Sequence, residues 1–267
     1  MLKKCIKYAV ICLVLLFMYV PIFILAVYSF TDSPNIGAIH SFSLKNYITL
    51  FTTAELRGMI IGSVLLALGS AVLATLLGTT GAIGVFYSGK RVKNTISVLN
   101  QVPVVNADVV TGFSICILLV VVFGISKDTY IPLVAGHVVL SAPFVYLAVS
   151  PKLKQMDPSL YEAALDLGAT PFYALIHVII PQVASGIVSG FVMAVTLSLD
   201  DYFVATYTKP ATFDTISTYV VNATKGAQTQ IKTALWALST IIFLLVVIIE
   251  VVMNFAPAVR KKEETHE

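Results

Sequence analysis

Residues 157–181, DPSLYEAALDLGATPFYALIHVIIP, are the most informative stretch of this 267-residue chain. Asp157 and Thr170 each precede a proline, and an N-cap residue followed by proline at the first helical position starts a helix. Gly168 lies between these two starts and is the residue type that ends a helix in the left-handed conformation. The stretch therefore predicts a helical hairpin, with a short helix, a turn and a second helix.

The first helix of this hairpin carries a narrow apolar stripe. Leu160, Ala163, Ala164 and Leu167 follow the i, i+3, i+4, i+7 spacing of one helix face. Two of the four side chains are small, which permits the close approach of another surface. The residues alone leave two alternatives open: the hairpin packs under its own helices, or it faces a partner protein.

The rest of the chain has the composition of a membrane protein. Apolar residues make up 58% and charged residues 12%, about half the charged share of soluble domains. Uncharged runs of about 20 residues predict six transmembrane helices in a single domain covering residues 1–267. The predicted spans are 8–30, 59–86, 99–123, 131–151, 181–207 and 234–255.

The basic residues predict the orientation of these spans. Six spans place both termini on one side, and if that side is the cytoplasm, eleven of the 17 Lys and Arg residues lie inside. The eleven are Lys3, Lys4, Lys7, Lys90, Arg91, Lys93, Lys152, Lys154, Arg260, Lys261 and Lys262. We therefore expect a multi-pass protein of the bacterial cytoplasmic membrane, with both termini and the hairpin in the cytoplasm.

Two adjacent acids in the fifth predicted span are candidates for a substrate pathway, because an ionised side chain in a bilayer is costly. Asp200 and Asp201 precede Tyr202, and acids beside aromatic rings suit an amine cation. The two acids point about 100° apart on a helix, so one can face a pathway while the other pairs elsewhere or caps the helix end. The alternative is an interfacial acid pair beside an aromatic belt.

Asp108 ends a run, 100–108, that contains one proline and four polar side chains. This run predicts an interrupted helix that lines a cavity or is buried in protein. The alternative role of Asp108 is a structural hydrogen bond between helices.

Glu250 is interpreted as structural, and His137 and His177 as ordinary helix residues. The cysteine and histidine spacings predict no metal site, and the chain has no G-x-x-x-x-G-K-[ST] phosphate loop.

The hairpin resembles the EAA-x3-G-x9-I-x-L-P loop signature of ABC importer permeases. The identical residues are Glu162, Ala163, Ala164, Gly168 and Pro181, and the departures are Val178 for isoleucine and Ile180 for leucine. The resemblance implies the type I permease fold, in which the hairpin docks in a groove of a separate ATP-hydrolysing subunit. Gly168 would make the turn. Ala163 and Ala164 would enter the groove, and Glu162 would make a polar contact.

Three further segments resemble the C-type permease of spermidine/putrescine importers: 42–47, 102–108 and 197–202. The resemblance implies a heterodimer with a second permease, two ATP-binding subunits, and an extracytoplasmic binding protein that delivers the polyamine. It implies transport without catalysis by this chain, with ATP bound by the partner and no cofactor of its own. The expected pathway residues are Asp108, Asp200, Asp201 and Tyr202.

Three alternatives remain. The chain could be a permease of the same class for another solute. It could be a gradient-driven secondary transporter whose acids relay protons, although that hypothesis leaves the hairpin unexplained. An intramembrane aspartyl protease is the third, but its G-x-G-D pattern is absent at Asp108 and Asp200.

Overall fold

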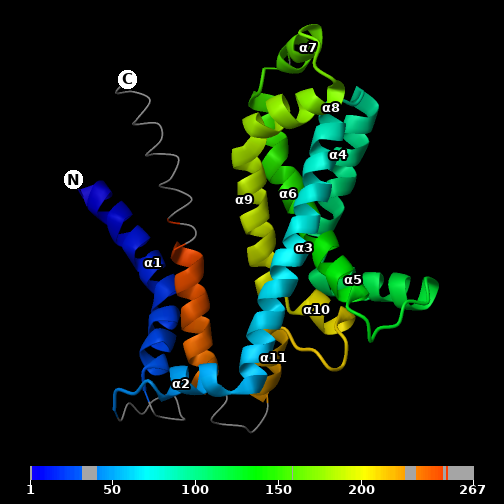
Figure 1. Cartoon of the computed structure of the whole chain (residues 1–267). Coiled ribbons are helices and arrows are strands. Elements are labelled where there is room, and N and C mark those ends of the chain that lie inside the picture. The colour runs from blue at the N-terminus through cyan, green and yellow to red at the C-terminus, as the bar shows by residue number, and fades with distance from the viewer. Residues whose placement is uncertain (1, 32–40, 158, 226–232, 249–250, 252–267) are drawn as a thin grey trace. The chain divides into compact units, whose positions relative to one another are not determined.

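The computed structural model describes residues 2–31, 41–157, 159–225, 233–248 and 251. The chain divides into two compact units, one made of residues 1–58 and 220–267 and one of residues 59–219. Within the described residues, regular secondary structure is helical apart from one isolated β-bridge (Figure 1). The predicted all-α class is therefore confirmed.

The first unit contains α1 (Leu2–Ser29) and α2 (Lys45–Thr52). Asn46, at the start of α2, is buried, and its side-chain amide donates to the carbonyl oxygens of Ser29 at 3.1 Å and Thr31 at 2.9 Å. Carbonyls at the end of a helix have no intrahelical partner. Asn46 therefore satisfies a backbone group at the end of α1 and fixes the segment that follows it.

The second unit is built on α6 (Ile131–Gln155), α9 (Ile180–Asp200) and the part of α3 (Ala54–Phe86) that follows residue 58. Figure 1 shows α6 and α9 side by side, and these two helices are in extensive contact. Its buried core combines small residues of α3 with larger aliphatic residues of α6 and α9. Core members include Ala71, Ala74, Ala82, Val138, Val145, Val149, Leu153, Ile179, Val183 and Ala194.

The close contact of α6 and α9 depends on Gly186. A Cβ there would lie 2.9 Å from the carbonyl oxygen of Ala148 and 3.2 Å from Cα of Val149. Because the backbone cannot move aside cheaply, we expect Gly186→Val to destabilise the protein by about 1–3 kcal/mol. The measurement is the thermal unfolding midpoint in detergent. Gly81→Val is the matched control, since no atom lies within 4 Å of a Cβ there; equal midpoints for the two variants would contradict the prediction.

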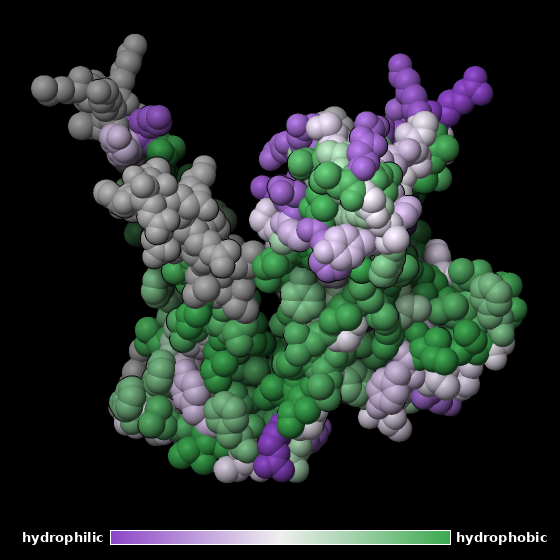
Figure 2. Space-filling view, turned by 45° about the horizontal axis from the view of Figure 1, so that its top comes forward, coloured by the Kyte–Doolittle hydropathy of each residue, from purple (hydrophilic) through white to green (hydrophobic). Residues whose placement is uncertain are grey.

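Each predicted span overlaps helical residues, although the bounds differ. Among the described residues, four helical stretches are long and apolar enough to cross a membrane, and the bent pair 90–105 and 108–122 is a fifth candidate. The sixth span corresponds to the shorter apolar helix Thr233–Ile248, next to residues outside the described part of the chain. Figure 2 shows hydrophobic residues along the flank of the second unit and hydrophilic residues at the end that carries α7 (Ser159–Asp166).

The fifth span differs most from its prediction of 181–207. The second hairpin helix, α8 (Pro171–Ala174), continues through a π-helical turn, Leu175–Ile179, directly into α9. Pro181 has no N–H to donate, and the π turn before it changes the hydrogen-bond register, with the Ile180 N–H bonded to the Leu175 carbonyl. The hairpin is therefore continuous with a membrane helix over Pro171–Asp200, and the predicted start of the span at residue 181 lies inside this helical stretch.

Candidate functional site

The third predicted span is broken where the sequence indicated an interruption. Helix α4 (Lys90–Val105) and α5 (Asp108–Cys116) meet at a bend of 103°, with Asn106 and Ala107 in extended conformation. The Asn106 side-chain amide donates to the Thr111 hydroxyl at 3.1 Å. The break leaves Asp108 in the first turn of α5. The predicted span of 99–123 is therefore a bent pair of helices, and the predicted interruption is confirmed.

A second break separates α9 from α10 (Phe203–Thr208). Asp201 is buried at this break, and its two carboxylate oxygens accept hydrogen bonds from the backbone N–H groups of Val204 at 3.1 Å and Ala205 at 2.7 Å. The first N–H groups of a helix have no intrahelical partner and favour a negative charge. Asp201 thus caps α10, which was one of the two roles that the sequence left open.

The two breaks lie against each other, because α10 packs on α5. A Cβ on Gly112 of α5 would lie only 2.7 Å from Cα of Val204 in α10. A cavity of about 390 Å³ opens beside this contact. Its lining residues are Val104, Asp108, Leu140, Phe144, Leu197, Asp200, Asp201, Tyr202 and Phe203. All four predicted pathway residues therefore line one cavity.

The lining of this cavity is acidic. It includes three aspartates and no lysine, arginine or histidine. Asp200 is exposed whereas Asp201 is buried, so Asp200 offers the more accessible carboxylate. Among the described residues, no group of three His, Cys, Asp or Glu side chains is placed to hold a metal ion. The lining is suited to an organic cation that meets carboxylates and the aromatic rings of Tyr202 and Phe203.

Sequence reasoning missed the residues behind this cavity. His137, interpreted as an ordinary helix residue, is fully buried, with Nδ1 2.7 Å from the Ser198 hydroxyl and Nε2 3.7 Å from Oδ2 of Asp201. No sequence spacing could have found the pair of His137 and Ser198, which are 61 residues apart. His177 is exposed and stacks on Tyr173, while Glu250 lies outside the described residues.

The hairpin forms at the opposite end of α9, and its turn follows the sequence prediction. Gly168 has φ +88°, in the left-handed region. Its N–H donates to the Leu165 carbonyl at 2.9 Å, and the Ala169 N–H donates to the Ala164 carbonyl at 3.0 Å. This pair of bonds is the Schellman motif, which ends a helix and satisfies its last carbonyls. The predicted turn at Gly168 is confirmed.

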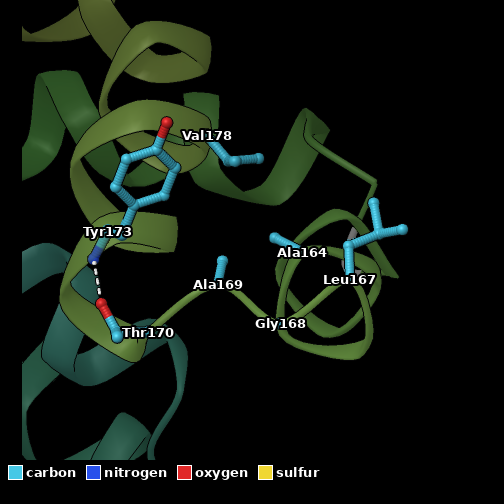
Figure 3. A pocket seen from close by; sticks show the side chains of 7 residues that line it. All are labelled: Ala164, Leu167, Gly168, Ala169, Thr170, Tyr173 and Val178. Atoms are coloured by element: carbon cyan, nitrogen blue, oxygen red, sulfur yellow. Dashed lines mark hydrogen bonds between the residues drawn. The ribbon is translucent and has the colours of Figure 1, made fainter.

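Both predicted caps also form. The Thr170 hydroxyl accepts the Tyr173 N–H at 3.3 Å, with proline at the first position of α8 (Figure 3). Before α7, the carboxylate of Asp157 accepts the backbone N–H of Ser159 at 2.9 Å and its hydroxyl at 2.8 Å. These two bonds lower the pKa of Asp157 from its ordinary value. Pro158 lies outside the described residues.

The hairpin exposes a hydrophobic surface. Leu167 is 89% exposed, Phe172 72% and Tyr173 54%. Glu162 and Ala163 are also exposed, while Ala164 is half-buried. A hollow of about 550 Å³ lies between α7 and α8, and Figure 3 shows the side chains that line it. Its lining residues are Ala164, Leu167, Gly168, Ala169, Thr170, Tyr173 and Val178. The aromatic pair Phe172 and Tyr173 was not among the predicted contact residues.

Residues 74–261 match the family model of binding-protein-dependent transport system inner membrane components. The chain belongs to this family. It is a permease subunit of an ABC importer and a multi-pass protein of the inner membrane, and it is not itself an enzyme.

Two curated relatives of this permease come from Escherichia coli strain K12. The chain is 31% identical to the putrescine transport system permease protein PotI, over 72% of this chain and 70% of the relative. It is 30% identical to the spermidine/putrescine transport system permease protein PotC, over 86% of this chain and 85% of the relative. The alignment with PotC thus includes most of both chains.

Solved structures support the fold of the permease. It superposes on a chain of a bacterial ABC transporter involved in alginate import with a TM-score of 0.72 and 19% identity, covering 98% of this chain and 95% of that chain. A structure of the alginate transporter in complex with a pentasaccharide-bound periplasmic protein also gives a TM-score of 0.72, with 17% identity and coverage of 93% and 92%. The predicted type I ABC importer permease fold is confirmed.

Proposed function

We propose that this permease carries polyamines such as spermidine and putrescine through the membrane. One observation supports this most directly: three aspartates line a single cavity at the helix breaks, and no basic side chain lines it. The named substrates of PotI and PotC are polyamines. A polyamine carries two or three positive charges, and carboxylates in the cavity would offset the hydration that those charges lose.

The exposed hairpin surface supports docking of an ATP-binding subunit. Hydrophobic side chains as exposed as Leu167 and Phe172 on a polar end of the protein mark an interaction surface. Two such subunits, one under each permease of a heterodimer, would bind and hydrolyse ATP. In this arrangement the hairpin and both termini face the cytoplasm, and Glu162, Ala163 and Ala164 contact the ATPase.

An extracytoplasmic binding protein would deliver the polyamine to the opposite side. The family description names this dependence on a binding protein, and one structural neighbour is in complex with a periplasmic protein. Helix α9 then links the two functional ends, because it continues from the hairpin and ends at Asp200. Its 21 residues span about 30 Å at about 1.5 Å per residue, so a rigid movement of the hairpin would reach the cavity directly.

Uptake of radiolabelled spermidine and putrescine tests this function. We expect cells that lack the chain and any redundant polyamine importer to lose at least 90% of uptake, and the wild-type chain to restore it, since no other route carries the cation at low concentration. Excess unlabelled spermidine should compete for uptake, whereas an uncharged diol of similar length should not. Uptake that is the same with and without the chain would reject the polyamine assignment and direct the search to other solutes of this permease class.

A further inference from the structure

His137 occupies a buried position where α6 contacts both α9 and α10. Its side chain is 0% exposed. The neighbouring Gly136 packs so closely that a Cβ there would lie 2.6 Å from Cγ1 of Val204 in α10. In the described part of the chain, Nε2 of His137 has no hydrogen-bond partner, and Oδ2 of Asp201 lies 3.7 Å from it. An imidazole buried beside a carboxylate is costly unless the two groups interact.

The other ring nitrogen of His137 contacts Ser198, which in turn contacts Ser70. The Ser70 hydroxyl donates to the Leu66 carbonyl at 2.7 Å, and its oxygen lies 3.2 Å from the Ser198 hydroxyl. Ser198 in turn lies 2.7 Å from Nδ1 of His137. When Ser198 donates to Nδ1, the single proton of the neutral ring is on Nε2, facing Asp201. In this arrangement the one proton of Ser198 goes to Nδ1 and that of Ser70 goes to Leu66, so the two hydroxyls are in contact without a hydrogen bond between them.

Asp201 connects this buried network to the cavity. Its carboxylate caps α10, and its backbone carbonyl accepts a hydrogen bond from the Ser217 hydroxyl. Asp200 precedes it in the chain and is exposed at the cavity. A shift of the Asp201 carboxylate would therefore move the α9–α10 break and, with it, the carboxylate of Asp200.

We propose that His137 is a positioning residue for transport: through Nε2 it holds Asp201, which fixes the α9–α10 break and aims Asp200 into the cavity. Ser198 orients the ring through its hydrogen bond to Nδ1. The inference rests on the proposed role of the cavity as a polyamine pathway. His137 itself does not line the cavity, so its effect on the substrate is indirect.

The test compares His137→Leu and His137→Gln in polyamine uptake by the assembled importer. Leucine removes both ring contacts, whereas the glutamine amide offers an acceptor to Ser198 and a donor to Asp201. We expect His137→Leu to lower the maximal rate about tenfold with an unchanged KM, since the binding protein sets the apparent affinity, and His137→Gln to retain at least half of the rate. The double variant His137→Leu/Asp201→Asn should be no slower than Asp201→Asn alone.

Ser141→Ala is the matched control, because Ser141 is buried on α6 one turn from His137 and its hydroxyl has no partner among the described residues. It should transport like wild type. Wild-type rates for His137→Leu, or no rescue by glutamine, would overturn the inference. If His137→Leu does not assemble, Ser198→Ala replaces it; a two- to fivefold lower rate supports the inference and a wild-type rate overturns it.

Asp200→Asn is assayed in parallel to separate the two proposals. Low uptake by Asp200→Asn together with wild-type uptake by His137→Leu rejects only the positioning role. Wild-type uptake by Asp200→Asn rejects the acid cavity as the pathway, and the proposed role of His137 fails with it.

Discussion

Gly168→Val is expected to reduce polyamine uptake at least tenfold while leaving the chain in the membrane. Gly168 has φ +88°, and a non-glycine residue in the left-handed region costs roughly 1–2 kcal/mol, with a higher cost for β-branched side chains. No atom lies within 4 Å of a Cβ at this position, so the effect comes from the backbone and not from a clash. Loss of the turn would move α7 away from α8 and remove the proposed ATPase contact.

The measurement combines uptake with co-purification of the ATP-binding subunits. Gly168→Asn is the conservative comparison, because asparagine tolerates the left-handed conformation better than other residues, and it should retain most uptake. Gly81→Val makes the same replacement where a Cβ has open space around it and should behave as wild type. If Gly168→Val retained both the ATPase subunits and normal uptake, the hairpin turn would have no role in coupling.

The hairpin was predictable because its determinants are local. Thr170 caps α8 by accepting the N–H of the residue three positions ahead, and the Gly168 turn is closed by bonds within six residues. The start of α9 was not predictable in the same way. Pro181 usually indicates a helix boundary, but the π turn Leu175–Ile179 carries the helix through it. A hydrogen-bond register shift has no simple sequence signal.

The sequence predicted the acidic residues of the cavity lined by Asp108, Asp200 and Asp201, but not the break between α9 and α10 beside them. The sequence placed Asp108 at an interruption, because proline and polar residues gather before it, and the cost of buried charge identified Asp200 and Asp201 as candidates. The end of α9 at Asp200 has no glycine or proline signal in 197–207. The break depends on a local contact, the cap that Asp201 makes on α10, and on a tertiary contact, the packing of α10 on α5.

The two adjacent acids are expected to differ when each is replaced by asparagine. Asp200→Asn removes a charge from the cavity without removing a bond that the fold uses, so we expect at least tenfold lower uptake with normal assembly. The reason is electrostatic: opposite unit charges about 4 Å apart attract by about 4 kcal/mol at an effective dielectric constant of about 20. Even part of that attraction exceeds the roughly 1.4 kcal/mol that corresponds to a tenfold change.

Asp201→Asn should also destabilise the protein, because an asparagine oxygen can replace only one of the two cap acceptors and leaves a buried N–H unpaired. An unsatisfied buried donor costs about 1–3 kcal/mol. The measurement is the thermal unfolding midpoint of each purified variant, together with uptake per assembled complex. A normal midpoint for Asp201→Asn, or a lowered one for Asp200→Asn, would contradict the assignment of the cap to Asp201 and of the pathway to Asp200.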